Sequence, residues 1–208
     1  KNVVKAYGDV TVVNDVSFKV EAGSLVTLLG PSGCGKTTTL RMIAGLEQPT
    51  SGQVWIGGRD VTLLPPLARN VSMMFQSYAL FPHMRVLDNV AYGLLNRGLK
   101  KADANERALE VLAQVNLEHL NQRWPAELSG GQQQRIGVAR AFAMDPGIIL
   151  MDEPFSALDP ITRSQLQDEL VNLQAKLRKT IVFVTHDMDE AVKIADRICI
   201  LHSGDILQ

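Results

Sequence analysis

The stretch that decides the fold is "SLVTLLGPSGCGKTTTLRMIAGL", residues 24–46. It begins with a run of apolar residues typical of a buried strand, passes through a glycine-rich loop and ends in a helical pattern. The loop Gly30–Thr37 fits G-x-x-x-x-G-K-[ST], and its position between a strand and a helix separates a phosphate-binding P-loop from a chance match. Backbone N–H groups and the positive end of the helix therefore predict a nucleotide phosphate site.

Each part of this loop has an expected role. Lys36 is predicted to contact the β- and γ-phosphates, and the Thr37 hydroxyl to bind Mg²⁺. The alternative, a glycine turn with a solvated lysine, leaves the strand–loop–helix context unexplained. The residues predicted to bind ATP here are Gly30, Pro31, Ser32, Gly33, Cys34, Gly35, Lys36, Thr37 and Thr38.

A second carboxylate is expected to complete the magnesium site. In "IILMDE" (residues 148–153) four apolar residues predict a buried strand, and Asp152 follows at its carboxyl end, where open α/β sheets bind their ligands. We predict that Asp152 binds Mg²⁺ and that Glu153 polarises an attacking water. Without a P-loop nearby, the same pair would be an ordinary solvated end of a strand.

Three further residues are candidates for the same site. His186 ends the strand pattern "TIVFVTH" and is expected to hydrogen-bond the γ-phosphate or the water; the less favoured alternative is an exposed or capping residue. Gln76 ends another strand pattern and is a candidate for contact with Mg²⁺ or the water. Tyr7 could stack on adenine or simply pack within its strand.

A second glycine-rich turn, Ser129–Gln132, precedes a helical pattern that runs to about Met144. Ser129 and Gln132 are spaced as a capping box, which needs no ligand. Gly130 and Gly131, however, each cost a helix about 1 kcal/mol relative to alanine, so something is expected to approach the backbone closely there. Because one γ-phosphate is already held by the P-loop, this turn is predicted to face the nucleotide of a second copy in a head-to-tail dimer.

Alternating buried strands and helices predict an α/β fold, a P-loop NTPase core with a mainly parallel sheet. Alternation over residues 3–22 adds an antiparallel β subdomain, and helical periodicity over about 88–127 adds a helical subdomain. Asp159 and Pro160 are typical of a helix start. We expect a single domain over 1–208, with 1–75 and 145–208 as the core with its β flank and about 88–144 as the helical subdomain.

Composition restricts the function. The formal net charge of −1 gives no basic field for nucleic acid, so none is expected as a partner. Two cysteines provide no disulfide framework. No apolar run is long enough to cross a bilayer and no signal-peptide pattern is present, which predicts a soluble protein.

Six motifs, in their order along the chain, closely resemble those of the ATP-binding subunits of ATP-binding-cassette (ABC) transporters. They are GPSGCGKTT, Gln76, LSGGQ (128–132), IILMDE, SALD (156–159) and His186. The resemblance covers essentially the whole chain. It implies that Tyr7 stacks on adenine, that Gln76 senses Mg²⁺ and the membrane partner, and that Glu153 is the catalytic base. It also implies that His186 senses the γ-phosphate, that Ser129–Gln132 acts on the partner copy's nucleotide, and that Asp159 couples the two sites.

The resemblance further implies an ATPase that powers import of a small solute through a separate membrane permease. Segment 77–94 resembles the permease-contacting part of importers of polyamines, ferric iron, sulfate and phosphonates, whereas residues 179–198 look more like quaternary-amine importers. The expected location is the cytoplasmic face of the inner membrane, with a solute-binding protein as an indirect partner. The alternative function is a non-transport ABC ATPase acting on nucleic acid or the ribosome.

Overall fold

The structure is a computed structural model that describes residues 1–75 and 80–208. Its contacts group the chain into two compact units, each described by itself below. The first consists of residues 1–73, 147–153 and 178–208, and the second of 74–146 and 154–177. The domain extents given above stay predictions, whereas the α/β class is confirmed by the mixed sheet and its helices.

A six-stranded sheet forms the centre of the first unit, in the order β10-β9-β3-β8-β7-β6. β3 runs parallel to β8 and β9, and β7 runs parallel to β8. β10 pairs antiparallel with β9 and forms a hairpin with it at the end of the described chain. The strands are β3 (Leu25–Leu29), β6 (Val71–Met74), β7 (Ile148–Asp152), β8 (Thr180–Thr185), β9 (Arg197–His202) and β10 (Asp205–Ile206).

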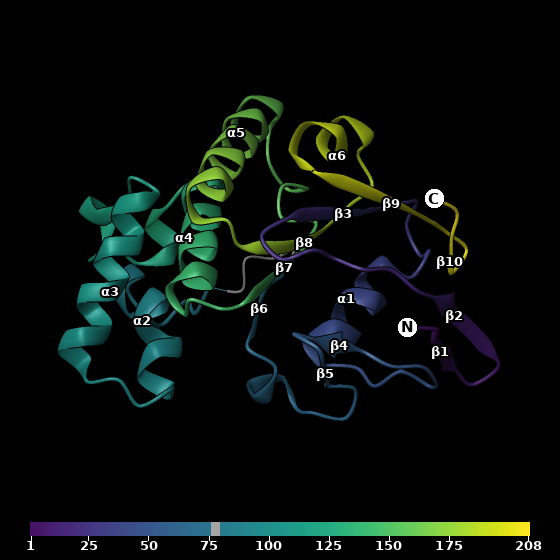
Figure 1. Ribbon diagram of the computed structural model, residues 1–208. Coiled ribbons are helices and arrows are strands. Elements are labelled where there is room, and N and C mark those ends of the chain that lie inside the picture. The colour runs from purple at the N-terminus through teal and green to yellow at the C-terminus, as the bar shows by residue number, and fades with distance from the viewer. Residues whose placement is uncertain (76–79) are drawn as a thin grey trace. The chain divides into compact units, whose positions relative to one another are not determined.

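Two short antiparallel pairs flank this sheet, β1 (Val3–Tyr7) with β2 (Val10–Val16) and β4 (Trp55–Ile56) with β5 (Arg59–Asp60). Strand structure therefore ends at Val16, earlier than the alternation to residue 22 predicts. α1 (Lys36–Ala44) lies on one side of the sheet and α6 (Met188–Ile194) on the other (Figure 1). The core combines buried sheet residues with one helix, and includes Leu28, Leu40, Leu150, Val182 and Val184.

Arg69, which follows the short 3-10 helix η1 (Pro66–Ala68), is a buried cation at the end of α1. Its guanidinium donates to the carbonyl oxygens of Met42 at 2.6 Å and Ile43 at 3.1 Å, and also to those of Thr62 and Leu64. Burial lowers the pKa of Arg69. The rigid fork of donors therefore binds carbonyls at the end of α1 and in the loop before η1, of which that of Met42 also accepts the Gly45 N–H.

Arg69→Ala should reduce the free energy of unfolding by about 3 kcal/mol, because buried carbonyl oxygens lose their donors. Arg69→Lys should recover part of this loss, since an ammonium has three donors but cannot reproduce the planar fork. Urea unfolding measures both effects. The control is Arg59→Ala on the exposed strand β5, which should change stability by less than about 0.5 kcal/mol. Equal costs at the two positions would contradict a capping role for Arg69.

The second unit is helical, as the middle of the sequence predicts. It contains α2 (Val86–Asn96), α3 (Lys101–Gln114), α4 (Gly130–Ala143) and α5 (Pro160–Leu177), with short 3-10 helices η2 (Glu118–Leu120) and η3 (Pro125–Glu127). α5 begins as predicted, because the Asp159 carboxylate accepts the backbone N–H groups of Ile161 and Thr162. These bonds satisfy two donors of the first turn.

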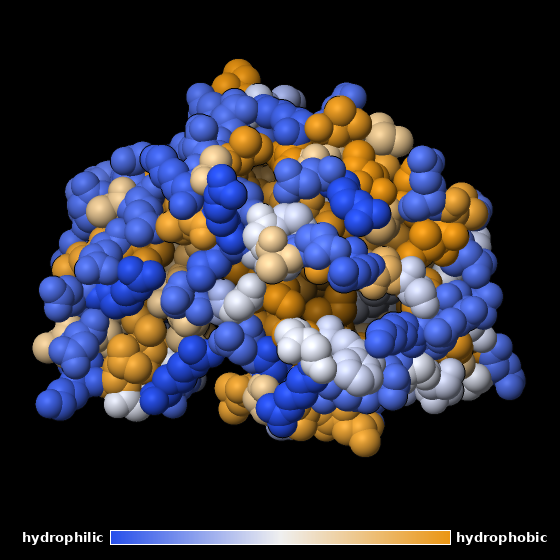
Figure 2. All heavy atoms as spheres, in the orientation of Figure 1, coloured by the Kyte–Doolittle hydropathy of each residue, from blue (hydrophilic) through white to orange (hydrophobic). Residues whose placement is uncertain are grey.

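The surface is mixed in character. Hydrophilic residues cover most of the face drawn in Figure 2, and apolar residues appear there in small groups. Exposed apolar side chains include Leu63 and Leu67 near η1. Within the described ranges 1–75 and 80–208, the helices are all too short or too polar to span a membrane.

Candidate functional site

The P-loop follows β3 and leads into α1. Gly35 has a left-handed backbone, with φ at 96°, and a Cβ there would lie 2.6 Å from the Val12 carbonyl oxygen in β2. Gly30 is crowded in the same way by the Leu201 carbonyl oxygen in β9. Neighbouring backbone therefore requires glycine at these two positions, and the loop is held in shape before any ligand binds.

The end of the P-loop provides donors for an anion. Gly35 is the N-cap of α1 and has no side chain with which to cap it, so the first-turn N–H groups face outward as donors. The Lys36 side chain is buried, and its Nζ donates to the carbonyl oxygens of Gly30 at 2.7 Å and Pro31 at 2.8 Å. Positive charge and amide dipoles thus gather at the same place, which favours a polyphosphate.

The structure brings together two of the three predicted magnesium ligands. The Thr37 hydroxyl at the start of α1 donates to Oδ1 of Asp152 at 2.9 Å. Hydroxyl and carboxylate oxygens are ligands that Mg²⁺ accepts, and it usually keeps several waters in addition. The pair therefore fits the ion. Gln76, the third candidate, lies outside the described residues.

Burial raises the pKa of Asp152, and this effect is opposed by the hydrogen bond from Thr37. A folded-state pKa above the unfolded value means that the ionised carboxylate costs stability at neutral pH, and that the cost disappears once pH falls below the ordinary value of 3.8. In EDTA, Asp152→Asn should therefore raise the melting temperature at pH 7 but not at pH 3.5. Thermal unfolding at both pH values measures this, and Asp189→Asn, an exposed carboxylate, is the control. A lower melting temperature at pH 7 would contradict the assignment.

Glu153 and His186 are in direct contact. Oε2 of Glu153 lies 3.0 Å from Nδ1 of His186. With the ring proton on Nδ1, His186 donates this hydrogen bond and the Glu153 carboxylate accepts it. Glu153 also has a left-handed backbone, with φ at 44°, which is uncommon outside glycine and typical of strained functional positions.

Sequence reasoning places Glu153 and His186 in one crevice but misses this hydrogen bond. The available signal is that each directly follows one of two buried strands. β7 and β8 are parallel neighbours in which Asp152 pairs with Val184, and the Glu153 N–H donates to the Val184 carbonyl at 3.0 Å. Two polar residues that end adjacent parallel strands are expected to meet at the same edge of the sheet.

Tyr7 lies at the end of β1 and is about half exposed. The Lys5 ammonium is 4.7 Å from its ring centroid, so one face of the ring already carries a cation–π contact. Stacking of adenine on Tyr7 stays a prediction.

The Ser129–Gln132 turn, in the second unit, forms the capping box that its spacing predicts. The Gln132 N–H donates to Ser129 Oγ at 3.3 Å, and the Ser129 N–H donates to the Gln132 side chain at 3.0 Å. Ser129 and Gly130 are exposed. Since the Ser129 oxygen is used here as an acceptor, its O–H remains suited to donate to an anion.

The segment predicted to contact a permease, 77–94, is described from residue 80. The fully buried side chain of Asn89 binds both the N–H and the carbonyl of Phe81, at 2.8 and 3.1 Å. It also donates to the carbonyl oxygens of Met84 and Arg85. The turn before α2 is therefore held from inside, while Pro82, His83 and Tyr92 stay exposed.

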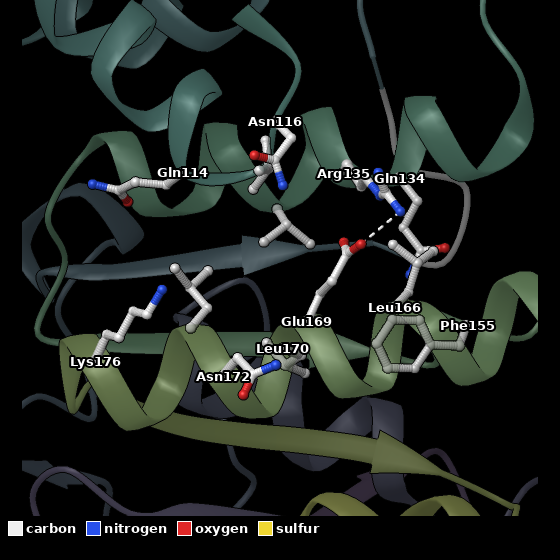
Figure 3. A pocket seen from close by; sticks show the side chains of 13 residues that line it. Gln114, Asn116, Gln134, Arg135, Phe155, Leu166, Glu169, Leu170, Asn172 and Lys176 are labelled. Carbon is white, nitrogen blue, oxygen red and sulfur yellow. Dashed lines mark ion pairs between the residues drawn. The ribbon is translucent and has the colours of Figure 1, made fainter.

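A cavity of about 200 Å³ lies between α4 and α5 of the second unit (Figure 3). It contains none of the predicted site residues. The Arg135–Glu169 ion pair crosses it at 2.6 Å. Gln134 beside it is fully buried, and neither of its amide atoms has a hydrogen-bond partner among the described residues. Both atoms are closed off from solvent as well, so the polar groups that the cavity presents are those of the ion pair and of Gln114, Asn116, Asn172 and Lys176.

Comparison with known proteins gives consistent matches. The family model described as ABC transporter matches residues 13–156. The Fe(3+) ions import ATP-binding protein FbpC 1 of Rhizobium meliloti is 57% identical over all 208 residues of this chain, which cover 59% of that protein. The spermidine/putrescine import ATP-binding protein PotA of Rubrobacter xylanophilus is 49% identical, with 55% of its length covered. The chain thus spans less than two thirds of the curated relatives it matches.

A solved structure shares the fold over the whole chain. It is the dimeric ATP-binding cassette MJ0796 in a post-hydrolysis state, bound to ADP and Pi. The TM-score is 0.88 at 35% identity, and the match covers 100% of this chain and 95% of the other.

Proposed function

Because this chain belongs to the ABC transporter family, we propose that it is the ATP-binding and ATP-hydrolysing subunit that powers import of a small solute through a separate permease. The observation that carries the proposal is the arrangement at the carboxyl edge of the sheet. There Thr37 contacts Asp152 at 2.9 Å, and Glu153 contacts His186 at 3.0 Å.

Each of these residues has a separate role in the in-line transfer of the γ-phosphoryl group to water. The P-loop amides and Lys36 hold the phosphates and neutralise charge that develops on them. Mg²⁺ held by Thr37 and Asp152 would supply further neutralisation. Glu153 orients and polarises the attacking water, and His186 fixes the position of the Glu153 carboxylate through its Nδ1–H.

The second glycine-rich turn is assigned to the nucleotide of a second copy. Its support is the exposed Ser129 and Gly130 at the start of α4, together with the dimeric state of the similar cassette. Two copies related by a twofold axis would then close two identical sites. ATP binding closes the pair and hydrolysis opens it, and this motion drives the permease.

The proposed location is the cytoplasmic side of the inner membrane, with segment 77–94 against the permease and a solute-binding protein as an indirect partner. Relatives at 55–57% identity are Fe(3+) ions import ATP-binding proteins, and the relative at 49% identity is a spermidine/putrescine import ATP-binding protein. Ferric ion is therefore the solute to test first, with spermidine as the comparison.

The test is release of free phosphate from Mg-ATP with no phosphoryl acceptor present. An ATPase of this type releases it, whereas a P-loop kinase needs an acceptor. Repeating the assay with duplex DNA and with RNA addresses the non-transport alternative, which requires the rate to change. A rate that depends on nucleic acid would overturn the importer assignment.

A further inference from the structure

Gly131 lies against the first turn of α5. A Cβ at this position would be 2.8 Å from Cγ2 of Thr162, closer than such atoms approach in proteins. At the adjacent Gly130 a Cβ would meet only Leu158, at 3.8 Å, which is ordinary contact. Neither glycine has a left-handed backbone, so alanine fits the local conformation of both. The two glycines therefore differ in the space around them.

The backbone of Thr162 is held in place by Asp159, whose carboxylate accepts the backbone N–H of Thr162 at 3.0 Å. Because threonine is branched at Cβ, its χ1 angle has few preferred values in a helix, so the methyl group has little freedom to move away from Gly131.

The contact is the first of a series along the two helices. One turn further along α4, Arg135 forms its 2.6 Å ion pair with Glu169 of α5 (Figure 3). Leu166 and Leu170 of α5 are buried on the same side, next to Phe155. α4 and α5 are therefore connected at their start and again at Glu169, seven residues after Thr162.

We propose that Thr162 is a positioning residue which connects the Ser129–Gln132 turn to Asp159 within one copy, and that position 131 is glycine because the Thr162 methyl group occupies the space of a side chain. A displacement of the turn by a nucleotide then reaches Asp159 through a single side chain. The consequence for ATP rests on the proposed function, but the contact itself does not.

The test combines Gly131→Ala with Thr162→Ser, which removes the methyl group and keeps the hydroxyl. Without nucleotide, Gly131→Ala should lower the melting temperature of the parent chain. On the Thr162→Ser background the same change should raise it or leave it unchanged, because alanine favours a helix more than glycine does. Gly130→Ala is the matched control and should not lower the melting temperature on either background. Thr162→Val, which keeps a methyl group but loses the hydroxyl, should not rescue Gly131→Ala.

The functional readout is ATP-driven dimerisation of full chains that also carry Glu153→Gln. Gly131→Ala should raise the ATP concentration for half-dimerisation at least about tenfold on the parent, and less than about threefold on Thr162→Ser. The affinity of the monomer for a fluorescent ATP analogue should stay the same throughout. If Gly131→Ala raised the ATP concentration for half-dimerisation equally on the parent and on Thr162→Ser, the proposal would be overturned. The added methyl group would then clash with the nucleotide and not with Thr162. If the parent does not dimerise with ATP, the isolated chain does not form the proposed dimer, and the melting temperatures alone decide whether the contact is as described.

Discussion

Glu153→Gln is expected to abolish phosphate release while it leaves ATP binding intact. A glutamine has the size of glutamate and its side-chain oxygen still accepts the Nδ1–H of His186, so the geometry at 3.0 Å is preserved. What it lacks is the capacity to take a proton from water, and loss of a general base reduces the rate by about 10²–10⁴-fold. A single-turnover assay with radiolabelled ATP measures the hydrolytic step separately from binding.

The same variant should accumulate as an ATP-bound dimer, because closed sites no longer open by hydrolysis. Size-exclusion chromatography with light scattering, with and without Mg-ATP, would show it. Asp189→Asn, which removes an exposed carboxylate three residues after His186, is the control for charge and should change the rate by less than about twofold. A loss for Glu153→Gln below about tenfold would mean that another group activates the water.

His186→Ala separates positioning from proton transfer. It removes the partner of Glu153 but not the base, so its effect should be smaller than that of Glu153→Gln. The left-handed backbone of Glu153, with φ at 44°, already limits where the carboxylate can point. Under the proposed mechanism, strand β8 would therefore contribute to catalysis through His186, the residue that follows it.

Features set by local sequence were predictable. The P-loop, the Asp159 cap of α5 and the capping box of Ser129 and Gln132 each depend on residues a few positions apart. Short-range hydrogen bonding dictates such structures regardless of the rest of the chain. The fold class followed from the P-loop, since its strand and helix imply a parallel sheet around them.

Features that depend on segments far apart in the sequence could not be predicted from it. The contact of Thr37 with Asp152 joins residues 115 positions apart, and that of Glu153 with His186 joins residues 33 apart. Both require the order and register of β3, β8 and β7, which periodicity does not specify. The role of Arg69 could not be predicted either, because carbonyl acceptors on α1 leave no trace in sequence. The cost of two glycines in α4 was recognised from sequence, but Thr162, which approaches Gly131, was not.

Mixing two inactive variants should restore activity if the Ser129–Gln132 turn serves the partner copy. Lys36→Ala removes the amine that lies over the P-loop, and Ser129→Arg puts a large side chain at an exposed position of the turn. Each variant alone should lose at least about 100-fold in phosphate release, because each disrupts both sites of a symmetric dimer. The measurement is the phosphate release rate of each variant and of their equal mixture.

The expected recovery follows from symmetry. Random pairing makes half of the dimers mixed, and each mixed dimer has one site with an intact Lys36 from one copy and an intact Ser129 from the other, so about a quarter of all sites are active. The control mixture, Lys36→Ala with the Lys36→Ala/Ser129→Arg double variant, contains no intact P-loop and should stay inactive. If the turn instead acts on the nucleotide of its own copy, no mixed dimer contains a working site and the recovery is zero. If the turn serves only as a helix cap, the exposed turn touches no nucleotide. The Ser129→Arg variant should then have close to full activity before any mixing.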